Sequence, residues 1–143
     1  MDGLSAAASV IAVIQICGSV FDLCRTYYTG VKDARKDITR LRSEISRLEI
    51  ALTSVADLAD ADDSGKLSVL QTLAKQGGAL SQCENDLSAL LSRLQGGREK
   101  EEMKRFGWRS LTWPMKSKDV DKAIIDIERH KSLFYLALTA DAA

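Results

Sequence analysis

Hydrophobic positions recur at helical spacing along most of the chain, but one stretch near the N-terminus has almost no polar positions. Residues Gly3 to Phe21 carry no charged side chain, although 28% of the residues in the chain are charged. The residues that interrupt this apolar run are Ser5, Ser9, Gln15 and Ser19. We predict a helix over about residues 4–28 that ends near Gly30.

This first helix has two interpretations. A helix that is apolar nearly all round is either enclosed by neighbouring helices or surrounded by lipid, and this run approaches the roughly 20 residues that cross a bilayer. A signal peptide is not expected, because no Lys or Arg precedes the run and no cleavage-site pattern follows it. The first helix is therefore the core helix of a soluble bundle at rest, and membrane entry after a switch stays open.

The next segment has the clearest helical pattern in the chain. Its hydrophobic residues alternate spacings of three and four, which is typical of a helix that packs in a bundle: Ile38, Leu41, Ile45, Leu48, Leu52 and Val55. We expect this seam to be buried against the first and last helices. The opposite face is charged, and we expect solvated pairs such as Asp33 with Lys36, Asp37 with Arg40, and Glu44 with Arg47.

Two further helical segments follow, each bounded by a glycine pair. A short helix over about residues 66–75 should stop at Gly77–Gly78, and a longer one over about 80–94 should stop at Gly96–Gly97. The seam of the longer helix is Leu80, Cys83, Leu87, Leu90, Leu91 and Leu94. The acidic loop before them matches part of a calcium-binding EF-hand loop, but Gln71 stands where the bidentate glutamate is needed, so calcium is not expected.

The last helix is predicted over about residues 119–139, with Ser117 as its N-cap. The residues expected to face inward are Val120, Ile124, Ile127, Phe134 and Leu138, joined by Leu133 and Leu136. Together the segments predict one all-α domain over residues 1–143, a four-helix-type bundle with one or two short additional helices. The short loops favour mostly antiparallel neighbours.

The segment before the last helix combines basic and aromatic residues and contains both tryptophans of the chain. Such residues can lie at a bilayer interface next to anionic lipid. The residues of this possible lipid-facing patch are Arg105, Trp108, Arg109, Trp113, Lys116 and Lys118. In the alternative, the tryptophans cap the bundle and the basic side chains are solvated.

Composition excludes several classes of function. The chain has 20 Lys plus Arg and 20 Asp plus Glu, so it lacks the basic excess of a nucleic-acid binder. It has three cysteines and one histidine, His130, without metal-ligand spacing. We read the cysteines as reduced, buried thiols of an intracellular protein, and His130 as a structural or surface residue. No phosphate-binding loop, zinc-protease motif or catalytic constellation is present, so no enzyme, cofactor or metal is expected.

Three segments of the chain, in order, resemble the HeLo-like N-terminal domain of fungal proteins. They are MDGLSAAASVIAVIQ at the start, YYTGVKDARKDITRLRSEISRLEIAL, and LTWPMKSKDVDKAIIDIERHKSLFYLALTAD at the end. The turn at Trp113–Pro114 and the ending that follows it are more specific than the opening. The resemblance spans nearly the whole chain. In that family the domain precedes a nucleotide-binding oligomerisation module and is similar to the four-helix death-effector bundles of plant resistosomes and mixed-lineage kinase-like pseudokinases.

The resemblance implies a membrane-directed effector of regulated cell death in fungal incompatibility and innate immunity, the N-terminal part of a NOD-like receptor. It implies a cytoplasmic resting state, self-association driven by the C-terminal module, and action at the plasma membrane without a nucleic-acid partner. The first helix would be released, and its lipid-contacting residues would be Leu4, Val10, Ile11, Val13, Ile14, Ile16, Val20 and Phe21, with Gln15 and the serines facing neighbours or a pore. The rival interpretation is a non-lytic helical module for protein–protein interaction.

Overall fold

Four long helices make up most of the computed structural model, which describes residues 2–60, 71–73, 75, 77–103 and 112–140. They are α1 (Asp2–Gly30), α2 (Arg35–Asp60), α4 (Ala79–Met103) and α5 (Ser117–Ala140). No strand occurs within these residues, and residues 71–73 are helical as well. The predicted all-α bundle is therefore confirmed.

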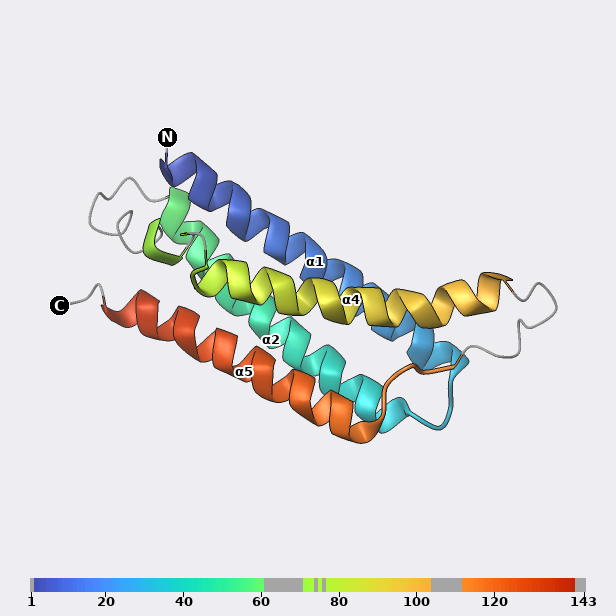
Figure 1. Cartoon of the computed structure of the whole chain (residues 1–143). Coiled ribbons are helices and arrows are strands. Elements are labelled where there is room, and N and C mark those ends of the chain that lie inside the picture. The colour runs from blue at the N-terminus through green and yellow to red at the C-terminus, as the bar shows by residue number, and fades with distance from the viewer. Residues whose placement is uncertain (1, 61–70, 74, 76, 104–111, 141–143) are drawn as a thin grey trace.

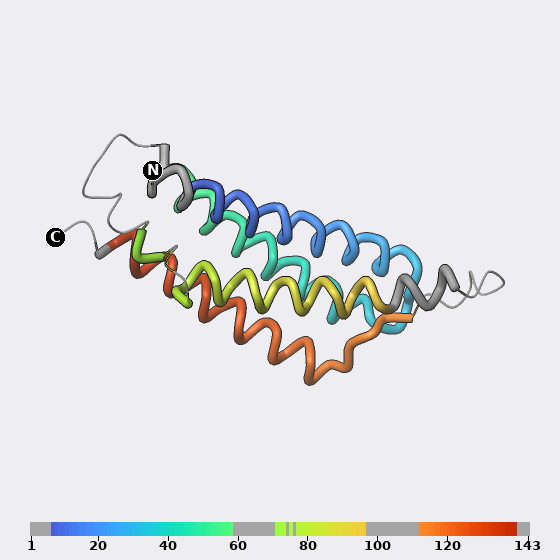
Figure 2. The backbone as a smooth tube through the Cα atoms, turned by 45° about the horizontal axis from the view of Figure 1, so that its top comes forward, coloured from blue at the N-terminus to red at the C-terminus, as the bar shows by residue number. Residues whose placement is uncertain are grey.

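The helices form a ring in the order α1, α2, α5, α4, so that α1 and α5 occupy opposite corners (Figures 1 and 2). Successive helices run in opposite directions. Two of the neighbouring pairs in this ring are nevertheless parallel. In the pair α1–α4, for example, Tyr27 bonds to Leu94 and Cys17 lies near Cys83, so residue numbers rise together along both helices. The prediction of mostly antiparallel neighbours is wrong for the pairs α1–α4 and α2–α5. The reason is that α2 and α4, which follow each other along the chain, lie at opposite corners and not side by side as short loops would place them.

The core forms around the seam of α2. All six of its predicted residues are fully buried: α2 packs against α1 and α5, and the seam belongs to one core cluster that also includes inner residues of α4. Burial against α1 and α5 is confirmed. Each such side chain contributes about 1.5–3 kcal/mol when it is fully buried. The seam of α4 is also buried, except that Leu91 is only partly covered.

The two glycine pairs behave differently. Gly77 has a φ of +79°, a backbone conformation that favours glycine, and the amide of Gly78 donates to the carbonyl of Lys75. Residues 71–73 are helical and Lys75 is not, so the described part of the predicted short helix ends before this glycine pair, whereas residues 66–70 lie outside the described residues. The prediction that Gly96–Gly97 ends a helix is wrong, because α4 continues through both residues to Met103. A glycine inside a helix costs only about 1 kcal/mol, which the packing of a long helix outweighs.

The predictions for α5 need two corrections. Lys116, not Ser117, caps the helix: its carbonyl accepts from the amides of Asp119 and Val120, and its own amide donates to the Asp119 carboxylate. Ser117 instead donates its hydroxyl to Asp37 of α2 at 2.6 Å. The second correction concerns Leu133 and Leu136, which are 39% and 66% exposed rather than inward. The inward face is already filled by Val120, Ile127 and Phe134, with Ile124 and Leu138 packed against it.

Candidate functional site

Helix α1 is the candidate functional element. Its residues Ala7–Gly30 form the one helix, in the part of the chain that the structure describes, that is long and apolar enough to cross a membrane. The criterion concerns length and composition only, and the core helix of a soluble protein or a signal sequence also meets it. Only 33% of its most apolar part is buried inside the bundle.

The residues proposed to contact lipid lie on more than one side of α1. Val10, Val13 and Val20 point into the core and are fully buried. Three others are partly buried and pack against that core: Ile14, Ile16 and Phe21. Ile11 faces outward and is 50% exposed, and the side chain of Leu4 lies outside the described residues. The bundle therefore sheathes α1 on its inner side only.

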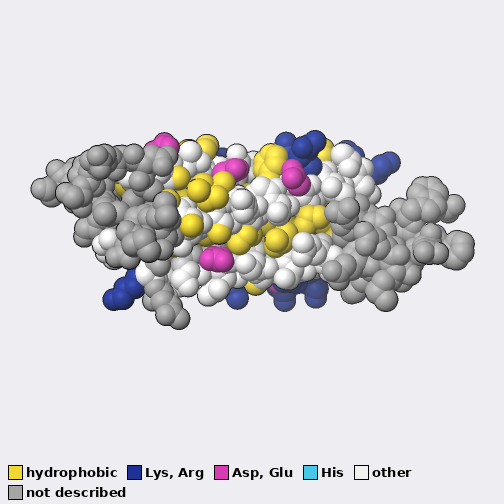
Figure 3. Space-filling model, turned by 90° about the horizontal axis from the view of Figure 1, so that it is seen from above, with side chains coloured by type: hydrophobic (Ala, Val, Ile, Leu, Met, Phe, Trp, Pro, Cys, Tyr) yellow, Lys and Arg dark blue, Asp and Glu magenta, His cyan; other side chains and the backbone are white. Residues whose placement is uncertain are grey.

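The outer face of α1 carries no charge over three turns. Ala8, Ile11, Gln15 and Ser19 are exposed there, and Asp22 is the first charged residue on this face. Figure 3 views the bundle from the side on which α1 lies, and it shows apolar side chains along the middle of the face, acidic groups beside them and basic groups mainly at the margins. A solvated helix face usually carries more charge than this. The inner face of α1 is thus apolar, and its outer face is uncharged and only weakly polar.

The C-terminal end of α1 is anchored by polar and aromatic contacts. Tyr27 is buried, and its hydroxyl donates to the Leu94 carbonyl of α4. Its ring meets Trp113 edge to face, with the centroids 5.1 Å apart. Trp113 is only 9% exposed, so in this structure it belongs to the bundle and not to a lipid-facing patch. Lys116 and Lys118 are exposed, whereas Arg105, Trp108 and Arg109 lie outside the described residues.

Two arginines of α2 stack on aromatic rings of α1, a feature that the sequence analysis missed. The guanidinium of Arg42 lies 5.1 Å from the ring centroid of Phe21, and that of Arg35 lies 5.1 Å from the ring centroid of Tyr28. The two arginines are seven residues apart along α2, and the two rings are seven residues apart along α1. The two pairs therefore repeat the same contact one heptad further along the antiparallel helices. This matching heptad spacing is the sequence signal that would have revealed the pairs.

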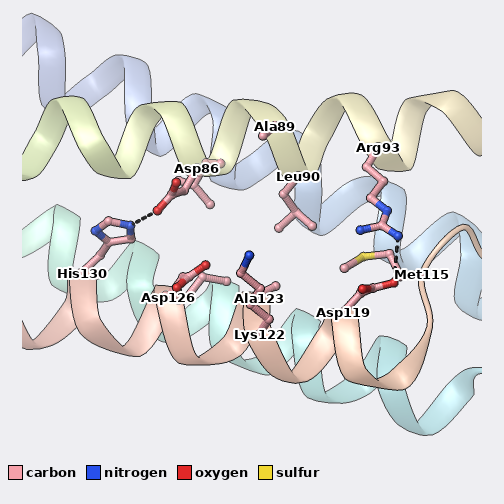
Figure 4. A pocket seen from close by; sticks show the side chains of 12 residues that line it. Asp86, Ala89, Leu90, Arg93, Met115, Asp119, Lys122, Ala123, Asp126 and His130 are labelled. Carbon is pink, nitrogen blue, oxygen red and sulfur yellow. Dashed lines mark hydrogen bonds and ion pairs between the residues drawn. The ribbon is translucent and has the colours of Figure 1, made fainter.

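A hollow with a volume of about 260 Å³ lies between α4 and α5 (Figure 4). His130 of α5 lies at one end, buried, with its Nε2 2.6 Å from the Asp86 carboxylate of α4. Arg93 and Asp119 form an ion pair of 2.8 Å at the other end. The backbone amide of Lys116 and then Arg93 lower the pKa of the Asp119 carboxyl. The hollow is thus closed at each end by a polar bridge between the helices.

Glu44 corrects the prediction that the charged face of α2 is solvated. Its side chain is 3% exposed and bonds to Lys131 of α5 at 3.0 Å and to Arg47 at 3.4 Å. The predicted pair of Asp37 with Arg40 is present at 3.3 Å, and Arg40 also pairs with Asp121 of α5 at 2.7 Å. The charges of α2 therefore hold α5 in place as well as meeting solvent.

The three cysteines are buried and free, as expected. Burial raises the pKa of the Cys17 and Cys24 thiols from 9.0 to about 12, and it raises the pKa of Cys83 as well. Neutral, buried thiols are poor nucleophiles and poor metal ligands. No group of three or more potential metal ligands lies together within the described ranges.

Comparisons with protein-family models, with curated proteins and with solved structures gave no match.

Proposed function

We propose that this protein is a membrane-directed effector domain of regulated cell death, of the kind that the resemblance to fungal HeLo-like domains implies. In this proposal α1 is sheathed in a cytoplasmic resting state. Self-association through a C-terminal nucleotide-binding oligomerisation module brings several copies together at the plasma membrane, where α1 leaves its bundle and enters the bilayer. The observation that carries the proposal is the uncharged run Gly3–Phe21 on a helix with an uncharged outer face.

The energetics favour α1 over the other helices for this role. Lipid tails are as apolar as a leucine side chain, so inner residues such as Val10, Val13 and Val20 remain in apolar surroundings when they move from the core to lipid. Helices α2, α4 and α5 carry charged residues along their length. Each charge costs about 2.5–3.5 kcal/mol at the centre of a membrane helix on insertion scales. Only α1 avoids that cost over a sufficient length.

Several copies acting together would make the binding effective. A single marginal helix binds a membrane reversibly, whereas linked copies gain affinity from their high effective concentration. In an assembly, Gln15 and the serines of α1 would face neighbouring helices or a water-filled pore, which satisfies their hydrogen bonds. Released copies also expose the core surface that α1 covered, and self-association would cover this surface again.

The test places a charge on the outer face of α1 without disturbing the folded bundle. Ile11 is 50% exposed in the folded bundle and would contact lipid in the inserted helix, so Ile11→Glu should melt like the unaltered chain, yet its charge should block leakage of vesicles by the artificially oligomerised chain. Ser88→Glu, which adds the same charge on an exposed position of α4, is the matched control and should leak normally. Equal leakage by a folded Ile11→Glu variant would contradict the proposal and leave the non-lytic interaction module as the better function.

A further inference from the structure

Three arginines without carboxylate partners converge at the end of α1 that meets α2. Arg40, Arg47, Arg93 and Arg129 each form an ion pair with an Asp or Glu. Arg25, Arg35 and Arg42 form none, among the arginines whose side chains the structure describes. Arg25 and Arg42 line a hollow of about 470 Å³ together with Asp22, Thr26, Tyr28 and Thr29, and Arg35 lies over the ring of Tyr28 beside it. Unpaired positive charge is thus concentrated at one place on the surface.

The aromatic rings hold these cations in a form suited to phosphate. The guanidinium of Arg42 lies over the ring of Phe21 and that of Arg35 over the ring of Tyr28, so each ring helps to position a guanidinium that forms no ion pair. Arg35 uses one N–H on the Tyr28 carbonyl at 3.3 Å, which leaves its terminal nitrogens available. The edge of a guanidinium binds two phosphate oxygens at once. Stacking therefore fixes the side chains in advance of binding.

The position of the cluster along α1 identifies the source of the phosphate. The uncharged run Gly3–Phe21 contains 19 residues, so it is about 28 Å long as a helix, close to the roughly 30 Å of a bilayer core. Arg25 and the exposed Tyr28 follow within two turns of its end, at the level where arginine and aromatic residues meet headgroups. Ile11, Gln15, Asp22 and Arg25 share one face of α1 by their spacing. The cations and the outer face can thus meet one membrane surface together.

From this geometry we infer that Arg25, Arg35 and Arg42 form a binding site for the phosphate groups of anionic phospholipids on the folded, resting bundle. The site docks the domain with α1 against the bilayer before any helix is released. It also sets the direction in which α1 inserts, because the C-terminal end of α1 stays at the near membrane surface while its N-terminal end enters the bilayer. This inference rests on the proposed function but concerns the step before insertion. It places the lipid contact at the α1–α2 end and not on Lys116 and Lys118.

The experiment measures co-sedimentation of the monomeric chain with vesicles of phosphatidylserine and phosphatidylcholine. The variant Arg25→Gln, Arg35→Gln, Arg42→Gln should bind on the order of a hundredfold more weakly, because each cation contributes about 1 kcal/mol near an anionic surface. The control Lys118→Gln, Lys122→Gln, Arg129→Gln removes the same charge from α5, at the opposite corner, and should bind as the unaltered chain does. Equal losses in the two variants, or no loss in the first, would overturn the inference. Circular dichroism melts establish that both variants fold.

Two further arms sharpen the result. Asp22 lies in the same hollow and repels phosphate, so Asp22→Asn should bind these vesicles roughly fivefold more tightly; weaker binding would count against the site. Excess inorganic phosphate should not displace the bundle from the membrane, and displacement would show a site for the free ion instead. Leakage by oligomerised chains is measured separately. Normal docking without leakage contradicts the proposed function alone, and leakage that persists when the arginine variant no longer docks overturns this inference alone.

Discussion

Helices α1 and α5 occupy equivalent corners of the bundle, since each packs between α2 and α4, yet they are held there by different forces. The described contacts of α1 with its neighbours are mainly apolar, with one buried hydrogen bond from Tyr27 and two arginine–aromatic stacks. Helix α5 is bridged to α2 by Asp121 and Lys131, and to α4 by Asp119 and His130. The comparison shows that apolar contacts can be exchanged for lipid, whereas ion pairs cannot.

The largest loss of stability should come from disrupting the buried seam of α2, against which both α1 and α5 pack. Leu48 of α2 is fully buried, so Leu48→Asp places an unpaired charge in the core and should cost several kcal/mol, enough to unfold the domain. Ile50 is on the same helix and is 60% exposed, so Ile50→Asp should change the melting temperature little. Thermal melts followed by circular dichroism compare the two, and a Leu48→Asp variant as stable as Ile50→Asp would show that the seam is not the core.

Alkaline pH should lower the stability of the folded domain through the buried thiols of α1. Cys17 and Cys24 on α1 have pKa values raised by burial from 9.0 to about 12. A thiol with a raised pKa stays protonated in the folded state while the unfolded chain ionises. Its stabilising contribution is therefore complete below about pH 9 and is lost as pH rises toward 12, by at most about 1.4 kcal/mol per thiol per pH unit.

Urea unfolding between pH 8 and 11 measures this loss. The double variant Cys17→Ala, Cys24→Ala should be less stable at neutral pH because it loses buried atoms, but its free energy of unfolding should fall less steeply with pH. The same slope in the variant and in the unaltered chain would mean that these thiols are not the groups that titrate.

A smaller loss of stability should result from breaking an ion pair between α5 and α2. Lys131→Met removes the Lys131 partner of buried Glu44 and leaves this carboxylate with Arg47 alone, at a cost of about 1–2 kcal/mol because Lys131 is itself partly exposed. Lys122→Met, at an exposed position of the same helix, is the control. The double variant Glu44→Leu, Lys131→Met should recover most of the stability, since no buried charge remains. Failure of this recovery would show that packing, and not charge pairing, fixes α5.

Sequence reasoning succeeded where a local pattern carries the information. The alternating spacing of Ile38 to Val55 predicted a buried seam because every residue on one face of a helix shares the same surroundings. It failed where a tertiary contact overrides a local rule. The glycines at 96 and 97 are helix breakers in isolation, and Glu44 is a typical solvated residue until Lys131 arrives from a helix 87 positions further along the chain.

One part of the candidate site can be recognised in the sequence, and another part depends on tertiary contacts. The uncharged run of α1 is visible in the sequence, because the absence of charge over 19 residues depends on no other segment. The unpaired arginines are not, since Arg25, Arg35 and Arg42 are three of many basic residues until the antiparallel packing of α1 on α2 brings them together.

By itself the sequence determined that this protein is a helical bundle with one helix polar enough for water at its surface and apolar enough for lipid. Only the tertiary structure decided that α1 lies opposite α5 and α2 opposite α4, that the neighbours α1–α4 and α2–α5 are therefore parallel, and which charges are paired. The physical reason is that the periodicity of a helix reports which face is buried, whereas the choice of partner for that face depends on how several helices pack at once.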